Sequence, residues 1–212
     1  VTELVSPDTV TEIGANQFAG CRSLEDVTIH EGVESVGADA FSECPNLLRA
    51  ERGIVYADKW VLSCAGDVSA AVLRSDTLGI ADEAFCESET LTSIELPDSV
   101  RYIGHRAFMY CSALETVTFG TGSELRIIAN QSFYNCSSLT SFTVPAGVTK
   151  IEAFAFNYNS LAAVVFENTS GWTVSKFDTA VGSSVSSAAL ADPEDAAGLL
   201  TRTYNGYYWS HA

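Results

Sequence analysis

The chain has 212 residues, with 27 Asp and Glu against 11 Lys and Arg, and its formal net charge is −16. This acidity argues against nucleic acid and anionic membrane surfaces as partners, because both would repel the chain. Hydrophobic residues make up 47% and charged residues 18%, a composition that excludes a disordered acidic chain and allows a buried core.

A repeat of about 23 residues begins near the N-terminus and predicts the architecture. In each copy a Phe follows an Ile or Val by five residues, as Phe18 follows Ile13. These residues are Phe18, Phe41, Phe85, Phe108, Phe133 and Phe156, and they are separated by 23, 44, 23, 25 and 23 positions. The double interval predicts one diverged unit between Phe41 and Phe85.

Each repeat predicts one short strand and one compact crossover. Leu114, Val117 and Phe119 show the alternation that puts side chains on opposite faces of a strand. The remaining I-G-x-x-A-F-x-x-C segment is too short for more than about two turns of α- or 3₁₀-helix. The expected fold class is therefore an α/β solenoid of stacked parallel strands with short helical or 3₁₀ crossovers.

This pattern resembles the BspA-like, Treponema-type leucine-rich repeat family, whose units run approximately L-x-x-I-x-I-P-x-x-V-x-x-I-G-x-x-A-F-x-x-C. The resemblance covers residues 1–167, and Pro7, Pro97 and Pro145 stand where the family has its turn proline. It implies a domain of about seven units, with the strands on a concave face.

The diverged unit lies at residues 53–77. Two short strands are predicted around the turn Ala57-Asp58-Lys59, followed by a ladder strand at residues 71–73. We therefore expect a hairpin-bearing variant repeat within the solenoid. Its Tyr56 and Trp60 are a second candidate contact for a partner, although packing of Trp60 onto the neighbouring repeat is the favoured alternative.

The period stops at Asn168, and residues 168–212 are predicted to form a C-terminal cap. Asp192 is suited to the N-cap and Pro193 to the first turn of a helix that extends to about Tyr204. This helix, with Tyr207, Tyr208 and Trp209, would cover the open end of the core, because a last repeat has no neighbour to bury its face.

The residues give no catalytic constellation. Six cysteines are spaced by 23, 20, 22, 25 and 25 residues, which follows the repeat and not a metal motif. Cys21, Cys44, Cys111 and Cys136 share one repeat position, so we expect them to stack as buried thiols that meet loop carbonyls. A disulfide between Cys21 and Cys44, or between Cys111 and Cys136, is the alternative. His30, His105 and His211 occupy unrelated positions. No catalytic residue, metal site or cofactor is expected.

The outward strand positions are the main candidate binding surface, because solenoids use such faces for recognition. Short hydroxyl side chains there can form hydrogen bonds with little loss of side-chain entropy, although Ser and Thr also simply suit exposed strands. The candidate residues are Asp26, Thr28, Arg49, Glu51, Ser93, Glu95, Thr116, Thr118, Ser141 and Thr143.

These observations predict a non-enzymatic interaction module with a protein or glycan partner, and no nucleic acid partner or direct membrane insertion. The resemblance implies a secreted or bacterial cell-surface protein that adheres to host matrix or to other cells. The sequence starts at Val1 with no Met, basic segment or apolar segment of a leader, so we expect a mature or trimmed chain. The alternative is a spacer or stalk that displays another domain and binds nothing itself.

Charge is unevenly distributed along the chain. Residues 1–98 contain 19 acidic and 5 basic residues, whereas residues 99–212 contain 8 and 6. We therefore expect a partner either on the near-neutral C-terminal repeats or, if it contacts the N-terminal half, with basic chemistry.

Overall fold

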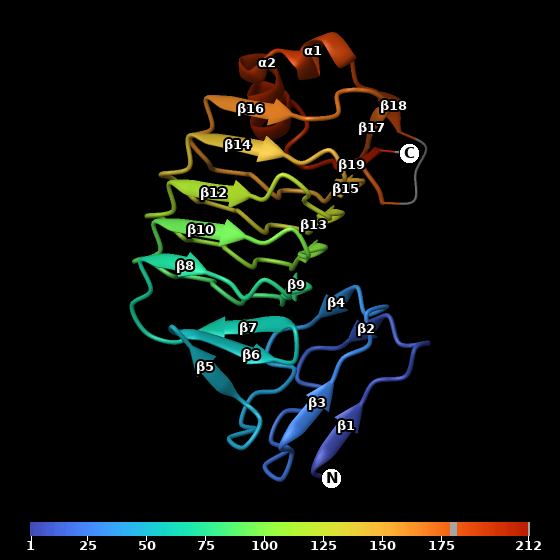
Figure 1. The fold of residues 1–212 in the computed structure, drawn as a ribbon. Helices are drawn as coiled ribbons and strands as arrows, with labels where there is room; N and C mark the ends of the chain where they lie inside the picture. The colour runs from blue at the N-terminus through green and yellow to red at the C-terminus, as the bar shows by residue number, and fades with distance from the viewer. Residues whose placement is uncertain (179–181, 212) are drawn as a thin grey trace.

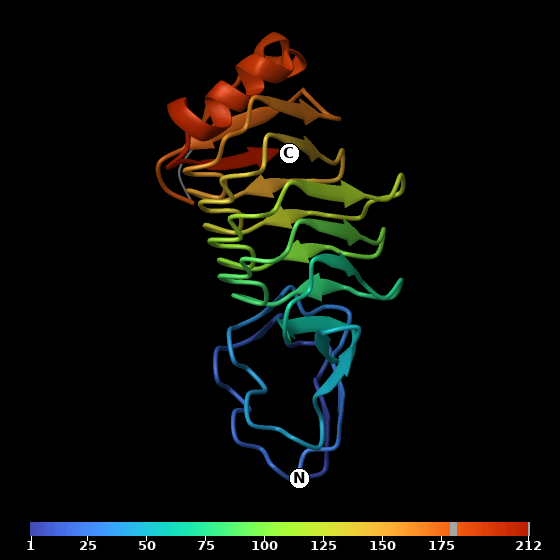
Figure 2. The same cartoon turned by 90° about the vertical axis from the view of Figure 1, so that its left-hand side faces the viewer.

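A computed structural model describes residues 1–178 and 182–211. Most of the chain winds into a solenoid in which each full repeat supplies two short strands, on opposite sides of the core (Figures 1 and 2). Strands from the L-x-x-V-x-I segments form the first ladder: β1 (Glu3–Val5), β3 (Asp26–Thr28), β8 (Ala70–Val72), β10 (Ser93–Leu96), β12 (Thr116–Phe119), β14 (Ser141–Val144) and β16 (Ala163–Phe166). This confirms the solenoid and the predicted strand segments.

A second ladder, made of two-residue strands, runs along the other side. Its members are β2 (Glu12–Ile13), β4 (Ser35–Val36), β9 (Gly79–Ile80), β11 (Tyr102–Ile103), β13 (Ile127–Ile128) and β15 (Lys150–Ile151). Each of these strands ends at the Ile or Val that stands five residues before the repeated Phe, as Ile103 does before Phe108. In the described part of the chain, β9, β11, β13 and β15 pair in parallel without a break.

The crossovers between the ladders correct the expectation of short helices. Each crossover consists of consecutive turns, and two residues in each adopt the left-handed conformation, as Glu83 (φ 61°) and Glu87 (φ 60°) do. A left-handed residue at every fourth position ends any helical run after one turn. The backbone N–H groups then bond to the next repeat, as Phe85 N–H does to Ala107 O at 2.7 Å, instead of within a helix.

The repeated Phe residues form a continuous stack in the core. The rings of Phe85, Phe108, Phe133 and Phe156 lie 5.0, 5.0 and 5.3 Å apart and within 10° of parallel. All four are at most 1% exposed. Each repeat contributes one ring, and the distance between successive rings is close to the distance between neighbouring strands of a sheet.

The hairpin divides the solenoid into two parts. Strand β5 (Arg49–Glu51) pairs antiparallel with β6 (Ile54–Ala57), which pairs with β7 (Trp60–Cys64), and β7 joins β9 in parallel. We call residues 1–47 the first stack and residues 70–167 the second stack. The buried residues form two hydrophobic clusters. One fills the second stack and the cap, and the other fills the first stack and includes some residues of the hairpin and the second ladder, such as Trp60 and Tyr102. Figure 1 shows the first stack set off from the rest.

The two stacks meet on the outward side of the second ladder. Trp60 and Tyr102 belong to the same buried cluster as Val36 of the first stack. Polar contacts join the first stack to the second stack and to the hairpin. Asp82 N–H of the second stack donates to Val36 O at 2.9 Å. In the hairpin, Asp58 Oδ2 accepts from Ile29 N–H at 2.9 Å, and Lys59 Nζ lies 3.6 Å from Glu31 Oε1. The first stack therefore packs against the side of the second ladder, in addition to preceding it in sequence.

The tail closes the C-terminal end with strands as well as helices. It contains β17 (Trp172–Ser175), β18 (Ser183–Ser184), α1 (Ser187–Ala191), α2 (Pro193–Gly198), a π-helical turn (Leu199–Thr203) and β19 (Tyr208–His211). Asp192 Oδ1 accepts from Glu194 N–H and Asp195 N–H, which gives the predicted N-cap of α2. Strand β19 pairs antiparallel with β15 and so extends the second ladder.

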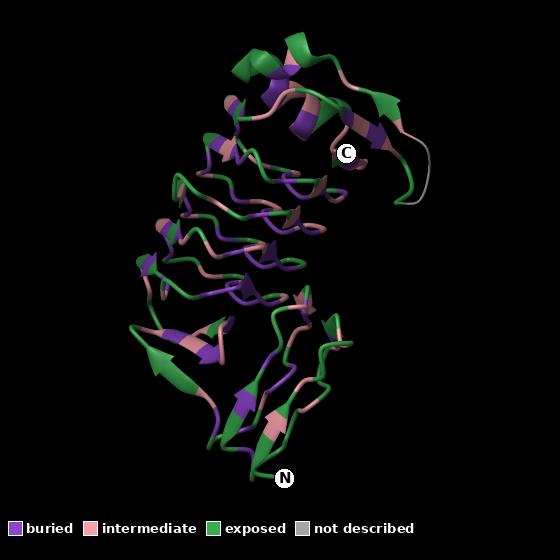
Figure 3. Ribbon diagram, turned by 45° about the vertical axis from the view of Figure 1, so that its right-hand side comes forward, coloured by how far each residue is buried: buried purple, intermediate pink, exposed green. Residues whose placement is uncertain are grey.

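The predicted helix over residues 193–204 is therefore present, with its second half in π geometry. Trp172 and Trp209, 2% and 1% exposed, pack around Phe166 at the end of the second stack. Figure 3 shows buried residues continuing from the repeats into this cap. Among the described residues, no helix has the length and apolar character needed to span a membrane.

Candidate functional site

Six of the predicted binding residues lie together on the outward face of the first ladder. They come in pairs from the neighbouring strands β10, β12 and β14, and we call this set the hydroxyl face: Ser93, Glu95, Thr116, Thr118, Ser141 and Thr143. The register places Ser93 beside Thr116 and Glu95 beside Thr118. The alternate residues Ile94 and Phe142 point into the core and are 1% and 3% exposed. Strand alternation thus sets this face, as the sequence predicts.

A shallow hollow of about 210 Å³ lies on the C-terminal side of the hydroxyl face. Its lining comes from β12, β14 and β16 and consists of Glu115, Thr116, Val117, Ser141, Phe142, Thr143, Ala163 and Val165. Val165 is 47% exposed, so the hollow has an apolar edge. The hydroxyls of Thr116, Ser141 and Thr143 have no side-chain hydrogen bond to any residue that the structure describes and can therefore bond to a ligand.

The other predicted strand residues do not join this face. Asp26 and Thr28 lie on β3, which pairs only with β1 among the described strands. Arg49 and Glu51 lie on β5, the edge strand of the hairpin sheet. The expectation of one ladder from Asp26 to Thr143 is corrected, because β5 turns back onto β6 and leaves the first ladder interrupted.

Tyr56 and Trp60 are buried, at 4% and 1% exposure, and present no ring to a partner. The Tyr56 hydroxyl accepts from Arg74 N–H at 3.3 Å, and the Arg74 guanidinium lies 4.2 Å from the ring centre. The Trp60 ring lies against Gly79, where a Cβ would come within 2.3 Å of it, and 6.1 Å from Tyr102. The alternative for Trp60, packing onto the neighbouring repeat, is confirmed.

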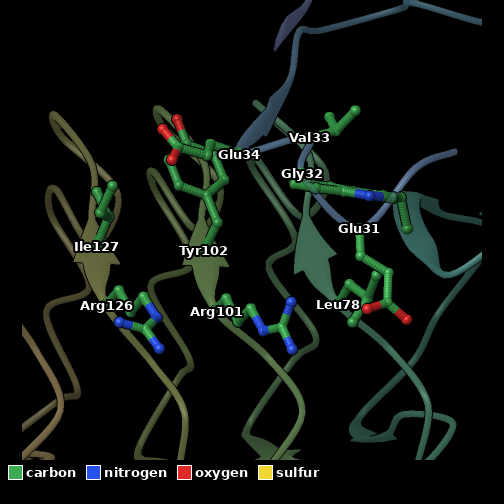
Figure 4. A pocket seen from close by; sticks show the side chains of 10 residues that line it. Glu31, Gly32, Val33, Glu34, Leu78, Arg101, Tyr102, Arg126 and Ile127 are labelled. Carbon is green, nitrogen blue, oxygen red and sulfur yellow. The ribbon is translucent and has the colours of Figure 1, made fainter. Parts of the chain in front are cut away.

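Sequence reasoning missed a cleft at the junction of the two stacks (Figure 4). Its volume is about 350 Å³, and its walls come from the turn Glu31–Glu34, from Trp60 and from the second ladder. Arg101 and Arg126 stand at equivalent positions of successive repeats, on the ladder side, and Glu31 and Glu34 come from the first stack. The only signal in the sequence was the repeated Arg before the ladder strand, since residues 31–34 and 101–127 meet only in the folded chain.

Titratable groups near this junction are perturbed by burial. Burial raises the pKa of the half-buried Asp82 above its ordinary value, while the N–H of His105, which donates to Asp82 Oδ1 at 2.8 Å, acts in the opposite direction. Burial also raises the pKa of Tyr102, and nearby carboxylates including Asp82 add to this effect. Both pKa shifts follow from burial and neighbouring charges in the fold. No group of three or more potential metal ligands is found in the described ranges.

The cysteines occupy structural positions in the crossovers. The thiols of Cys44, Cys111 and Cys136 donate to Phe18 O, Phe85 O and Phe108 O at 3.2, 3.0 and 3.1 Å. All six cysteines are free, and Cys21, in the first repeat, is exposed. The predicted contact between buried thiols and loop carbonyls is confirmed for Cys44, Cys111 and Cys136. The expectation that Cys21 is buried with them is wrong, because each buried thiol meets the Phe carbonyl of the preceding crossover and Cys21 lies in the first crossover of the chain.

Solved structures of bacterial proteins share this fold. A leucine-rich cell surface protein from Faecalibacterium prausnitzii A2-165 has a TM-score of 0.53 and 24% identity, over 78% of this chain and 53% of its own. The pneumococcal vaccine antigen PcpA has a TM-score of 0.57 and 16% identity, over 81% of this chain and 52% of its own. A leucine-rich repeat protein from Bacteroides capillosus ATCC 29799 has a TM-score of 0.50 and 24% identity, over 57% and 99%.

The chain thus spans about half the length of the first two proteins. No curated protein matches it. The family model of the BspA-type leucine-rich repeat region matches six copies, over residues 1–66 and 63–178, in agreement with the repeats and ladders described above. The chain therefore belongs to the BspA-type leucine-rich repeat family.

Proposed function

We propose that this chain is an extracellular or cell-surface adhesion module without catalytic activity, which binds a protein or a glycan through the hydroxyl face. The observation that carries the proposal is the hollow between β12, β14 and β16, where unpartnered hydroxyls adjoin the exposed Val165. Such a surface offers hydrogen bonds and apolar contact from rigid strands, which lowers the entropy lost on binding. The cell-surface protein among the structural neighbours supports this location.

The test combines binding measurements with two substitutions. The chain is applied to immobilised extracellular matrix proteins, mucins and glycan arrays, and then the Thr116→Arg/Thr143→Arg variant is applied to the same surfaces. The two arginines fill the hollow, so a ligand seated there should bind at least tenfold more weakly, about 1.4 kcal/mol. Thr11→Arg, at an exposed position of the first stack, is the control.

The outcomes separate adhesion from the spacer alternative. Binding that the Arg pair removes and Thr11→Arg leaves intact supports the proposal. Binding that survives both changes excludes the hydroxyl face as the contact. If no surface retains the chain, the adhesion proposal fails and the spacer function, in which the chain displays another domain, is favoured.

A further inference from the structure

The crossovers carry a periodic set of hydrogen bonds between repeats. Three alternate N–H groups of one crossover donate to three alternate carbonyls of the next. Glu83, Phe85 and Glu87 donate to the carbonyls of His105, Ala107 and Met109 at 2.9, 2.7 and 2.7 Å. The same arrangement joins residues 16–20 to 38–42, 106–110 to 130–134, and 131–135 to 153–157. Each crossover therefore has an accepting edge and a donating edge.

The crossover at residues 37–44 is an exception in the interior of the chain. Its carbonyls accept from Asn16, Phe18 and Gly20 N–H, but the N–H groups of Asp39, Phe41 and Glu43 have no acceptor in the part of the chain that the structure describes. The hairpin replaces the crossover that would otherwise follow. The interruption thus leaves a row of three unpaired donors, which is the crossover equivalent of an open sheet edge.

The C-terminal end of the second stack shows what covers such an edge. There, Phe154 N–H, at the equivalent of Asp39, donates to the main-chain carbonyl of Asn205 at 2.6 Å. Asn205 Nδ2 also donates to Asn157 Oδ1 at 3.0 Å, and Gly206 lies close against the Phe154 ring. At this end, a main-chain carbonyl from a non-helical segment therefore occupies the first donor position of a donating crossover edge.

The open edge in the first stack borders a hollow of its own. This hollow has a volume of about 230 Å³ and is lined by the crossover and by the half-buried side chains of Leu48, Val55 and Leu62. Asp39 and Glu43, the first and last residues of the donor row, are exposed and line this hollow. Residues 1–98, which contain the edge, have 19 acidic and 5 basic residues. The surroundings thus combine main-chain donors, an aliphatic floor and negative charge.

We propose that the open edge at Asp39, Phe41 and Glu43 binds an extended peptide segment of a partner protein, with alternating basic and aliphatic side chains. Its carbonyls accept from the three N–H groups, an aliphatic side chain enters the hollow between Leu48, Val55 and Leu62, and Lys or Arg side chains meet Asp39 and Glu43. This is strand addition applied to a turn edge, where main-chain bonds give affinity and side chains give selectivity. The site is separate from the hydroxyl face, so the two proposals can fail independently.

The experiment selects short linear peptides from a random display library on the intact chain and then titrates the best synthetic peptide by NMR. Asp39→Asn/Glu43→Asn removes both charges, and Asn tolerates the left-handed conformation of these positions (φ 57° and 55°). Glu83→Asn/Glu87→Asn is the matched control, because these residues have the same left-handed conformation. Each double variant also loses one exposed ion pair, Glu43 with Arg22 in the first and Glu83 with Arg106 in the control. The N–H groups of Glu83 and Glu87, however, already donate to the next crossover.

The proposal expects basic, aliphatic peptides to be enriched and the amide signals of Asp39, Phe41 and Glu43 to shift on binding and gain protection from hydrogen exchange. The Asp39/Glu43 variant should bind about tenfold more weakly, and the control should bind like the original chain. Enrichment of no peptide, or of neutral or acidic peptides, overturns the proposal. So does an equal loss in both variants, or a shift confined to other amides.

Discussion

Replacement of Phe108 by Ala tests whether the Phe stack is what holds neighbouring repeats together. Phe108 is 0% exposed and lies between Phe85 and Phe133, at 5.0 Å from each ring and within 10° of parallel. Replacement of a buried Phe by Ala costs about 3–5 kcal/mol in total, and the loss of two stacked ring contacts places Phe108 in the upper part of this range. We expect Phe108→Ala to lower the free energy of unfolding by about 4–5 kcal/mol.

The matched change is at the equivalent repeat position in the first stack. Phe18 is half-buried and has one ring neighbour, Phe41, at 5.3 Å. Phe18→Ala should therefore cost about 1–2 kcal/mol, because folding buries less of the Phe18 side chain and the substitution removes only one aromatic pair. Phe108→Leu, which keeps most of the volume, should cost less than about 1.5 kcal/mol.

Urea unfolding followed by circular dichroism measures the loss, and tryptophan fluorescence is a second probe, which reports on the hairpin through Trp60 and on the cap through Trp172 and Trp209. Two probes are needed because stability in a repeat protein is a sum over neighbours and the transition need not be two-state. Equal losses in Phe108→Ala and Phe18→Ala, or a loss below about 2 kcal/mol at Phe108, would refute the reasoning from stacking and burial.

Two further predictions concern ionisable groups. Because burial raises the pKa of Asp82 in the folded chain, its contribution to stability is complete below the unfolded pKa, about 4, and is lost as pH rises through the folded value. Asp82→Asn keeps an acceptor for His105 N–H but carries no charge. The melting temperature of this variant should therefore exceed that of the original chain by an amount that grows from pH 4 to pH 7. A difference that stays constant with pH would contradict this. Burial raises the pKa of Cys111 to about 12, so at pH 8 a thiol reagent should modify the exposed Cys21 first and reach Cys111 only on unfolding. Fewer than six reactive thiols in the denatured, unreduced chain would show that a disulfide is present.

Local periodicity was sufficient to predict the parts of the fold that repeat. The regular Phe spacing predicted that each ring occupies the same position in its repeat. The alternation around Val117 or Ile94 predicted that the residues of the hydroxyl face point outward. Helix-terminus chemistry at Asp192 and Pro193 located α2. Each of these features depends on residues within one repeat or one turn, where a pattern in the sequence determines the geometry.

The features that sequence reasoning missed depend on pairings between distant segments or on unusual backbone conformations. The second ladder has strands of two residues, too short for alternation to show. Apart from Gly20, the left-handed crossover positions hold other residues, such as Glu, Arg, Tyr and Asn, so no glycine pattern marks them. The pairing of β5 with β6 instead of β3 is a choice between two partners that no local signal decides.

That single choice separates the candidate site residues. Once β5 leaves the first ladder, Asp26 and Thr28 stay with the first stack, whereas Ser93 to Thr143 continue along the second. The same event opens the crossover edge at Asp39, Phe41 and Glu43 and lets residues 31–34 approach Arg101 to form the junction cleft. One inserted hairpin thus accounts for two surfaces that a regular solenoid would lack, the open crossover edge and the junction cleft.

The charge asymmetry separates the two proposed surfaces physically. The open edge lies among residues 1–98, with 19 acidic and 5 basic residues, whereas most of the hydroxyl face lies among residues 99–212, with 8 and 6. Attraction of a basic peptide by exposed carboxylates is screened over about 10 Å at 0.1 M salt, so that binding should weaken steeply as salt is added. Hydrogen bonds from Thr116 and Thr143 and contact with Val165 involve no pair of charges and should be nearly insensitive to salt. A salt titration of each binding reaction therefore assigns a ligand to one surface before any residue is changed.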